Sequence, residues 1–240
     1  MSDASGAHVS EAHGGAARVV LITGAGSGIG AALARRLAAP HTSLMLHARG
    51  ADDASRRRLV QVAADCTASG ARCATGFGDL AERGAAEHVI HQTLASFGAL
   101  DQLVANAGHA QRQTLAALDP DTFGAAFAAM PAAFAALVRR AMPALETSKR
   151  ARVVALSSFV AHRYRADAPF AATAAAKAAL EALAKTAAAE LAPLGVTVNC
   201  VAPGYTRRIA AQAPTTRPCG RTPPKPRRSV MLPNRTTSPR

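Results

Sequence analysis

The 240-residue chain contains no tryptophan, and its two tyrosines and seven phenylalanines amount to only 4% of the sequence. Alanine occurs 61 times, so helices can pack closely while the core has few large side chains. No apolar run approaches the roughly 20 residues of a membrane span, so we expect no integral membrane protein. A chain of this length can still bury a sizeable core.

Cysteine is also scarce. The four cysteines, at positions 66, 73, 200 and 219, form no CxxC pair and no spacing typical of a zinc site. The first 17 residues lack an apolar stretch after a basic start, which is not the pattern of a secretory signal. We therefore expect a cytoplasmic protein with free thiols, no metal site and a disordered extension over residues 1–17.

Acidic residues number 15 against 28 Lys and Arg, which gives a formal net charge of +13. Residues 214–240 hold seven of these basic residues and seven of the 14 prolines, but no acid and no alanine. The composition thus changes abruptly near Ala213, and we expect residues 213–240 to be a disordered tail rich in Pro, Arg and Thr.

Three interpretations of this tail compete. A reading-frame change in the coding DNA is favoured, because alanine disappears where proline, arginine and threonine accumulate. A genuine basic tail that meets nucleic acid or an anionic membrane is the second, and a cryptic substrate lid is the third. No aromatic residue interleaves the basic ones, which makes nucleic-acid binding unlikely.

Before the tail, short β-branched runs alternate with long Ala- and Leu-rich stretches. This alternation predicts parallel strands joined by right-handed crossovers, in a doubly wound α/β sheet that forms a single domain over residues 18–212. The expected strands are 18–23, 44–48, 72–76, 100–104, 152–156 and 196–201. The expected helices follow the first strand to about residue 39 and then cover 54–69, 81–96, 121–145 and 174–191.

A glycine-rich turn, Thr23-Gly-Ala-Gly-Ser-Gly-Ile-Gly30, joins the first predicted strand to the first helix. Glycines let a ligand approach the backbone closely, and the free N–H groups of a helix N-terminus attract negative charge. The turn therefore favours a dinucleotide pyrophosphate site, although a tight strand–helix turn alone can also need glycine. Its spacing differs from the general G-x-G-x-x-G pattern.

Three further motifs follow in order: Asp79-Leu80, Asp101-Gln-Leu-Val-Ala-Asn-Ala-Gly108 and Pro203-Gly204. With the glycine turn they make residues 18–212 resemble the classical short-chain dehydrogenase/reductase family. The resemblance implies a Rossmann-type fold and hydride transfer between a nicotinamide cofactor and a carbonyl or alcohol. The tail lacks that family's seventh strand, so we expect an exposed sheet edge and weakened oligomer contacts.

The resemblance also implies a cofactor site. In it the glycine turn would hold the phosphates, Asp79 and Leu80 would contact the adenine, and Asn106 to Gly108 would line the adenosine side. For Asp79, a helix N-cap is an equally good interpretation. The full set is Thr23, Gly24, Ser27, Gly28, Ile29, Gly30, Arg49, Asp79, Leu80, Asn106, Ala107, Gly108, Lys177, Pro203 and Gly204.

The choice between cofactors depends on the end of the second strand. An acid there would bind the ribose 2′-hydroxyl, but this chain has Ala48-Arg49. Arginine can pair with a 2′-phosphate through two parallel hydrogen bonds, so NADP is favoured over NAD. The alternative is that Arg49 is an ordinary solvated arginine. We interpret Arg56 to Arg58 as a solvated helix face rather than a second phosphate site.

The family's catalytic pattern is incomplete. Ser158, rather than Ser157, matches the family's serine, and Lys177 matches its lysine. The tyrosine should lie four residues before this lysine, so that both project from one helix face, but Thr173 stands there. A threonine is shorter, and its hydroxyl stays protonated in water, so we assign it no proton-donor role.

From the sequence alone, no other residue can be assigned to the missing catalytic positions. Tyr164 is the nearest phenol and is expected to be a surface tyrosine, as His162 is expected to be an exposed loop residue. The family's catalytic asparagine aligns with Met130, which Pro131 follows. We therefore predict an oxidoreductase with impaired catalysis. A non-catalytic NADP-binding protein and a defective remnant are the alternatives.

Overall fold

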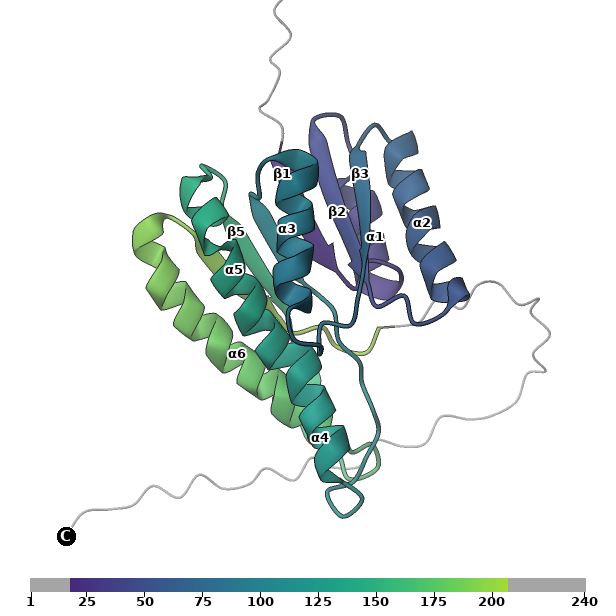
Figure 1. The fold of residues 1–240 in the computed structure, drawn as a ribbon. Coiled ribbons are helices and arrows are strands. Elements are labelled where there is room, and N and C mark those ends of the chain that lie inside the picture. Colours follow the sequence, from purple (N-terminus) through teal and green to yellow (C-terminus); the bar gives the residue numbers. More distant parts are fainter. Residues whose placement is uncertain (1–17, 207–240) are drawn as a thin grey trace, which may run out of the picture. The chain divides into compact units, whose positions relative to one another are not determined.

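The computed structural model describes residues 18–206, which form a six-stranded sheet flanked by helices (Figure 1). The strand order is β3-β2-β1-β4-β5-β6 and every pairing is parallel, so the predicted doubly wound α/β fold is confirmed. Within the described residues β6 is an edge strand, as expected for a sheet without a seventh strand. The strands are β1 (Arg18–Thr23), β2 (Thr42–Ala48), β3 (Arg72–Phe77), β4 (Gln102–Ala105), β5 (Arg152–Leu156) and β6 (Thr197–Val201).

The helices lie close to the predicted ranges, except that α3 begins four residues later than expected. Gly84, with φ +83°, caps it, and Asp79 accepts the N–H of Ala81 in the preceding turn. Asp79 is therefore not the N-cap of this helix. The helices are α1 (Gly28–Leu37), α2 (Asp53–Ala68), α3 (Ala85–Phe97), α4 (Pro120–Phe127), the π-helical η1 (Ala128–Ala132), α5 (Ala133–Thr147), the short η2 (Phe159–Ala161), α6 (Ala171–Leu191) and the short η3 (Ala192–Leu194).

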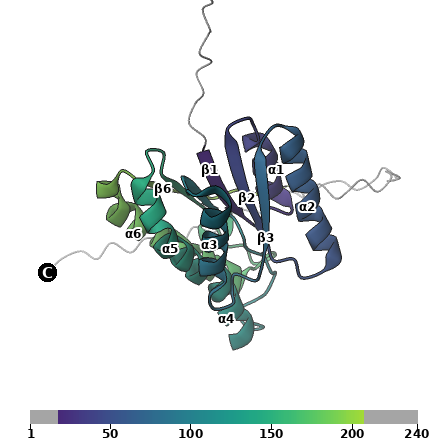
Figure 2. The ribbon, with the colours of Figure 1, turned by 45° about the horizontal axis from the view of Figure 1, so that its top comes forward.

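Two hydrophobic clusters hold these layers together. Helices α1 and α2 pack on one face of the sheet, where Leu44 and Leu46 of β2 point. Helices α3, α5 and α6 pack on the other face (Figure 2). Met45 of β2 belongs to the hydrophobic cluster on that face. The alternation follows from the two-residue period of a strand, and burial on both faces explains why β2 is buried throughout.

One expectation about apolar runs is wrong. The continuous helical segment Pro120–Thr147 is long and apolar enough to cross a membrane by length and composition, with a mean hydropathy of 1.5 over its most apolar window. In this fold the same segment belongs to the core layer, because Phe134, Leu137 and Ala141 are buried against α3 and the sheet. The buried core helix of a soluble protein can have the same length and apolar composition as a membrane span.

The sheet topology also places the loops that carry the sequence motifs. Strands β1 to β3 follow one another toward one edge of the sheet, and β4 to β6 follow one another toward the other edge. The loops after the adjacent strands β1 and β4 therefore lie next to each other at the carboxyl ends of the strands. Ligands of open α/β sheets bind at such a switch point.

Candidate active site

The glycine turn after β1 leads directly into helix α1. Gly24 and Gly28 have φ values of +67° and +55°, in the left-handed region that glycine adopts without steric cost. The first turn of α1 contains no acidic residue, so its N-terminal N–H groups are not already neutralised by a neighbouring carboxylate. This turn can receive an anionic group such as a phosphate.

A cleft of about 310 Å³ opens in front of the turn. Its lining includes the backbone of the turn, the end of β2, the start of α2 and the loops after β3 and β4. Seven residues of the predicted cofactor set line it: Gly24, Ser27, Arg49, Asp79, Leu80, Ala107 and Gly108. The remainder of that set, which lies outside the lining, comprises Thr23, Gly28, Ile29, Gly30, Asn106, Lys177, Pro203 and Gly204.

Asn106 and Thr23 join the turn after β1 to the loop after β4, and neither residue lines the cleft. The Asn106 side-chain amide donates to the carbonyl oxygens of Thr23 (2.9 Å) and Gly24 (3.1 Å). In return, the Thr23 hydroxyl accepts the backbone N–H groups of Asn106 (3.1 Å) and Ala107 (3.0 Å). These four bonds fix the turn after β1 against the turn after β4, which stabilises the floor of the cleft.

Sequence reasoning missed that Arg58 lines the cleft, together with Ser55. Asp52 caps α2 by accepting the Ser55 N–H at 2.6 Å, and this capping box sets the first turn of α2 beside Arg49. Ser55 and Arg58 are three residues apart and so share one helix face. A helix predicted over residues 52–58 would already have placed Ser55 and Arg58 on one face. Arg49 itself lies 4.0 Å from the carboxylate of Asp79.

His47 is a second missed residue. It lies in β2 one residue before the end of the strand, it lines the cleft, and it is only 3% exposed. Burial lowers its pKa to about 4, so the ring is uncharged at neutral pH. Its Nδ1 atom has no hydrogen-bond partner among residues 18–206, so one buried polar atom of this residue is unsatisfied.

Next to the loop after β4, Lys177 and Thr173 lie on one face of α6, outside the lining of the cleft, and both are buried. The Lys177 Nζ atom donates to the carbonyl oxygen of Leu156 at 2.5 Å, and burial lowers its pKa to about 8. The Thr173 hydroxyl accepts the backbone N–H of Gln111 at 3.1 Å. Thr173 stands at the position of the family's tyrosine, and it holds the loop after β4 against α6.

Met130 also lies next to the loop after β4. A Cβ atom built on Gly108 would lie 3.2 Å from the Lys177 Nζ and 3.3 Å from the Met130 Sδ, so these three residues meet. Met130 is 1% exposed and sits in η1, a π-helical turn that also contains Pro131. A thioether is at best a weak hydrogen-bond acceptor, so it cannot hold a water molecule as an asparagine amide does.

The loop after β5 holds the remaining candidates. Ser158 caps η2, and its hydroxyl accepts the Val160 N–H at 3.4 Å. Ser157 donates instead to Glu181, to which His162 also bonds at 2.9 Å.

Tyr164 is 80% exposed, and its hydroxyl donates to the carbonyl oxygen of Ala161 at 3.4 Å. This hydroxyl is not hydrogen-bonded to Lys177. The placement agrees with a surface tyrosine rather than with a substitute for the missing phenol.

Replacing Lys177 with methionine is expected to stabilise the fold by about 2 kcal/mol at pH 7. A lysine whose folded pKa is about 8 instead of 10.5 costs roughly 3 kcal/mol, and its hydrogen bond to Leu156 returns about 1 kcal/mol. Because the unfolded chain binds the extra proton, the cost is full below pH 8 and disappears as the pH rises to 10.5.

Urea unfolding at several pH values checks this result. The unmodified chain should gain stability between pH 8 and 10.5, whereas Lys177→Met should lack that gain. Equal pH profiles for the two chains would contradict the burial of a charged amine. Lys185, which is exposed on the same helix, provides the control substitution Lys185→Met, for which no such change is expected.

Comparisons with known proteins agree with this geometry. The family model described as short chain dehydrogenase matches residues 18–217. The chain belongs to the short-chain dehydrogenase family. Family membership implies a nicotinamide dinucleotide as cofactor and a small molecule as substrate.

Individual relatives are similar over most of the chain. The short-chain reductase protein NovJ of Streptomyces niveus is 35% identical over 193 residues, which are 78% of this chain and 68% of that protein. The D-beta-hydroxybutyrate dehydrogenase of Cupriavidus necator is 28% identical, with 78% and 70% covered. A short chain dehydrogenase from Burkholderia cenocepacia, solved in complex with NADP, is 33% identical with a TM-score of 0.73, over 80% of this chain and 76% of that one. A relative from Mycobacterium paratuberculosis, solved bound to NAD, is 28% identical with a TM-score of 0.71, over 78% and 71%.

Proposed function

We propose that the chain binds NADP in the cleft of about 310 Å³ and carries out the family's carbonyl–alcohol hydride transfer slowly or not at all. The observation that carries the proposal is the contrast between the two ends of the site. At one end, which we assign to the adenosine, the glycine turn, Arg49 and Arg58 line the same cleft. At the reacting end, Thr173 and Met130 occupy the positions of a phenol and an amide.

The adenosine end favours NADP because of its two arginines. Arg49 and Arg58 both line the cleft, and Ser55 lies between them along the chain. The carboxylate of Asp52 is engaged by the N–H of Ser55, which holds the pKa of Asp52 below its usual value. Asp52 and Asp79 also line the cleft, so the support for NADP is the fork geometry of Arg49 and Arg58, since a guanidinium group can donate two parallel hydrogen bonds to a 2′-phosphate.

At the reacting end, a bound nicotinamide would supply or accept the hydride. In the family's pattern Lys177 would bind the nicotinamide ribose, and Ser158 would hold the substrate carbonyl oxygen. Lys177 now donates to Leu156, and Ser158 accepts from Val160. We assign Thr173 no proton-donor role, because its side chain is shorter than a tyrosine and its hydroxyl oxygen holds the backbone N–H of Gln111.

A fluorescence titration with NADPH and NADH tests the cofactor assignment. We expect saturable binding of NADPH, weaker binding of NADH, and a roughly tenfold loss of NADPH affinity in Arg49→Ala with little change for NADH. Arg57→Ala is the matched control, because Arg57 is exposed on α2 and does not line the cleft. Equal affinities for the two nucleotides would disprove the NADP preference, and binding of neither would favour a defective remnant.

A non-catalytic NADP-binding protein remains the second candidate function. The hydrogen bond between the buried Thr173 and Gln111 favours it, because this bond joins the loop after β4 to α6 where a substrate would enter. Binding of NADPH without turnover of any ketone would support this candidate.

A further inference from the structure

The turn between α2 and β3 brings two cysteines together. Cys66 lies in the last turn of α2, and Cys73 is the second residue of β3. The Cys66 carbonyl oxygen accepts the backbone N–H groups of Ser69 (3.1 Å) and Ala71 (3.2 Å), and Gly70 has a left-handed φ of +90°. This tight turn folds the start of β3 back against the end of α2.

The two thiols are free, and they contact each other within the hydrophobic cluster that packs α1 and α2 on the sheet. Cys66 is fully buried, whereas Cys73 is half-buried. The Cys66 thiol donates a hydrogen bond to the Cys73 sulfur, and the Thr67 hydroxyl donates to the same sulfur. Two sulfurs in such contact can reach the bonding distance of about 2.05 Å by small side-chain movements.

The surroundings of the two thiols differ in a way that sets an order of reaction. Burial raises the pKa of both thiols, that of Cys66 to about 11. The thiolate is the form that attacks a disulfide. Cys73 is the more exposed of the two, and the two donors at its sulfur favour its thiolate. Cys73 is therefore the thiol that an external reagent meets, and Cys66 lies ready to attack the Cys73 sulfur afterwards.

We propose that Cys66 and Cys73 form a redox-active pair, which a small-molecule disulfide such as oxidised glutathione converts into an intramolecular disulfide bond. The Cys73 thiolate attacks one sulfur of the reagent, which forms a mixed disulfide and releases one reduced thiol. Cys66 then loses its proton and attacks the Cys73 sulfur, which forms the intramolecular bond and releases the second reduced thiol. Two protein thiols are thereby oxidised, one reagent disulfide is reduced, and the two protons pass to the released thiols.

The bond would fasten the end of α2 to β3, which is an edge strand of the sheet within the described residues. It closes a loop of eight residues, and restricting the unfolded chain in this way should raise the Tm by about 5 °C. Arg58, the α2 residue nearest to Cys66 in the lining of the cleft, lies about 12 Å away along the helix axis. The proposal therefore does not depend on cofactor binding.

Peptide mapping of the oxidised chain tests the proposal, in a background that carries Cys200→Ser and Cys219→Ser. The reduced chain is treated with oxidised glutathione under native conditions, and the remaining thiols are blocked with N-ethylmaleimide. Trypsin cuts after Arg58, Arg72 and Arg83, so it separates Cys66 from Cys73. We expect peptides 59–72 and 73–83 to be joined by a bond that reduction breaks.

The same treatment in urea provides the comparison with the unfolded chain. A disulfide that stabilises the fold is itself favoured by folding to the same degree, because the two equilibria are linked. The joined peptides should therefore form at least about tenfold more favourably in the native chain than in urea.

Two single substitutions in this background test the order of the steps. Cys66→Ala should retain one glutathione on Cys73, because no second thiol is present to release it. Cys73→Ala should incorporate glutathione at least about tenfold more slowly, because Cys66 is fully buried and its pKa is about 11. Neither variant should show the rise in Tm.

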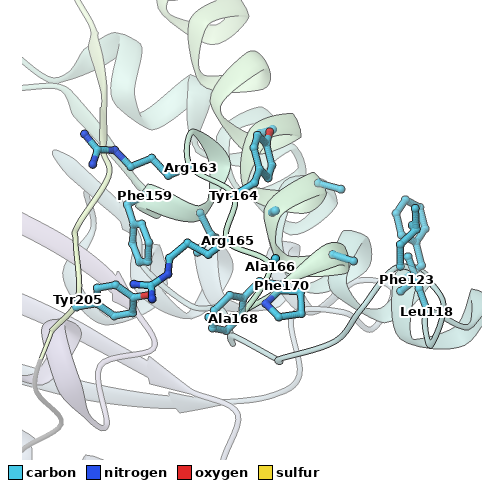
Figure 3. Close-up of a pocket in the computed structure, with 17 residues that line it drawn as sticks. Leu118, Phe123, Phe159, Arg163, Tyr164, Arg165, Ala166, Ala168, Phe170 and Tyr205 are labelled. Carbon is cyan, nitrogen blue, oxygen red and sulfur yellow. The ribbon is translucent and has the colours of Figure 1, made fainter. Parts of the chain in front are cut away.

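The two tyrosines provide an internal control, since the chain contains no tryptophan. Tyr164 and Tyr205 both line a cavity of about 560 Å³ beside α6 (Figure 3), and no residue of α2 or β3 belongs to that lining. Tyrosine fluorescence should therefore stay unchanged on oxidation, because the bond acts only at the junction of α2 and β3.

Three results would overturn the proposal. The first is the absence of joined peptides after treatment of the native chain. The second is a bond that forms equally well in urea, since the fold would then not bring the thiols together. The third is a lower Tm or a changed tyrosine fluorescence in the oxidised chain, because the bond would then form only by disrupting the fold.

Discussion

Replacing Thr173 with tyrosine is expected to raise ketone-dependent NADPH oxidation by at least about 100-fold, the lower end of what a positioned proton donor contributes. Thr173 lies one helical turn before Lys177, so the new phenol would project from the same face of α6. At pH 7 Lys177, with a pKa of about 8, is mostly charged, and its ammonium would favour the phenolate and lower the phenol's pKa.

The substitution has a structural consequence as well. Thr173 is 2% exposed and bonded to Gln111, so a tyrosine ring must displace the loop after β4 before its oxygen reaches the cleft. Opening this loop would also admit substrate to the reacting end.

Thr173→Phe is the matched control, because it requires the same space but carries no hydroxyl. A panel of small ketones provides the rate measurement. The ultraviolet absorbance of phenolate provides a second readout that needs no substrate. The pKa of the added tyrosine should lie below 10, and it should return toward 10 when Lys177→Met is combined with it. Equal rates for the phenylalanine and tyrosine variants, or an unmodified chain as active as Thr173→Tyr, would contradict the proposed impairment.

Replacing Gly30 with alanine is expected to destabilise the fold by about 3 kcal/mol, near the upper end for overpacking a rigid site. The added Cβ would lie 2.4 Å from the Gly24 carbonyl oxygen and 2.6 Å from the Asn106 Nδ2. Neither atom can move freely, because the Asn106 amide is bonded to both Thr23 and Gly24. The close approach of α1 to the turn therefore requires glycine at this position.

Thermal unfolding measures this effect. At roughly 2–4 °C per kcal/mol for a domain of this size, the Tm should fall by about 6–12 °C. Gly26→Ala is the control: its Cβ would meet nothing closer than 3.6 Å, an ordinary van der Waals contact, so its Tm should change little. A Tm for Gly30→Ala equal to that of the control would show that the turn and the loop after β4 are not locked together.

Much of the fold follows from periodicity in the sequence. The strands 18–23 and 152–156 were predicted with the bounds that the structure has, because each is a short β-branched run ended by turn residues. The start of α3 was not predicted, because Gly84 caps it in a left-handed conformation and has no side chain that would mark an N-cap in the sequence. The membrane-length apolar segment was also misjudged, because its many alanines are apolar enough to keep the mean hydropathy at 1.5 although it contains few large apolar residues in succession.

The sequence by itself determined the family resemblance and the absence of a tyrosine and an asparagine at their expected positions, because these are matters of residue identity and spacing along the chain. Only the tertiary structure decided which residues meet. It brought Arg58 to the cleft beside the glycine turn, and it made Asn106 join the turn after β1 to the loop after β4. It also gathered the exposed side chains of Leu115, Phe123 and Tyr164 around one cavity. Such contacts depend on how helices and loops far apart in sequence pack together, which no local pattern specifies.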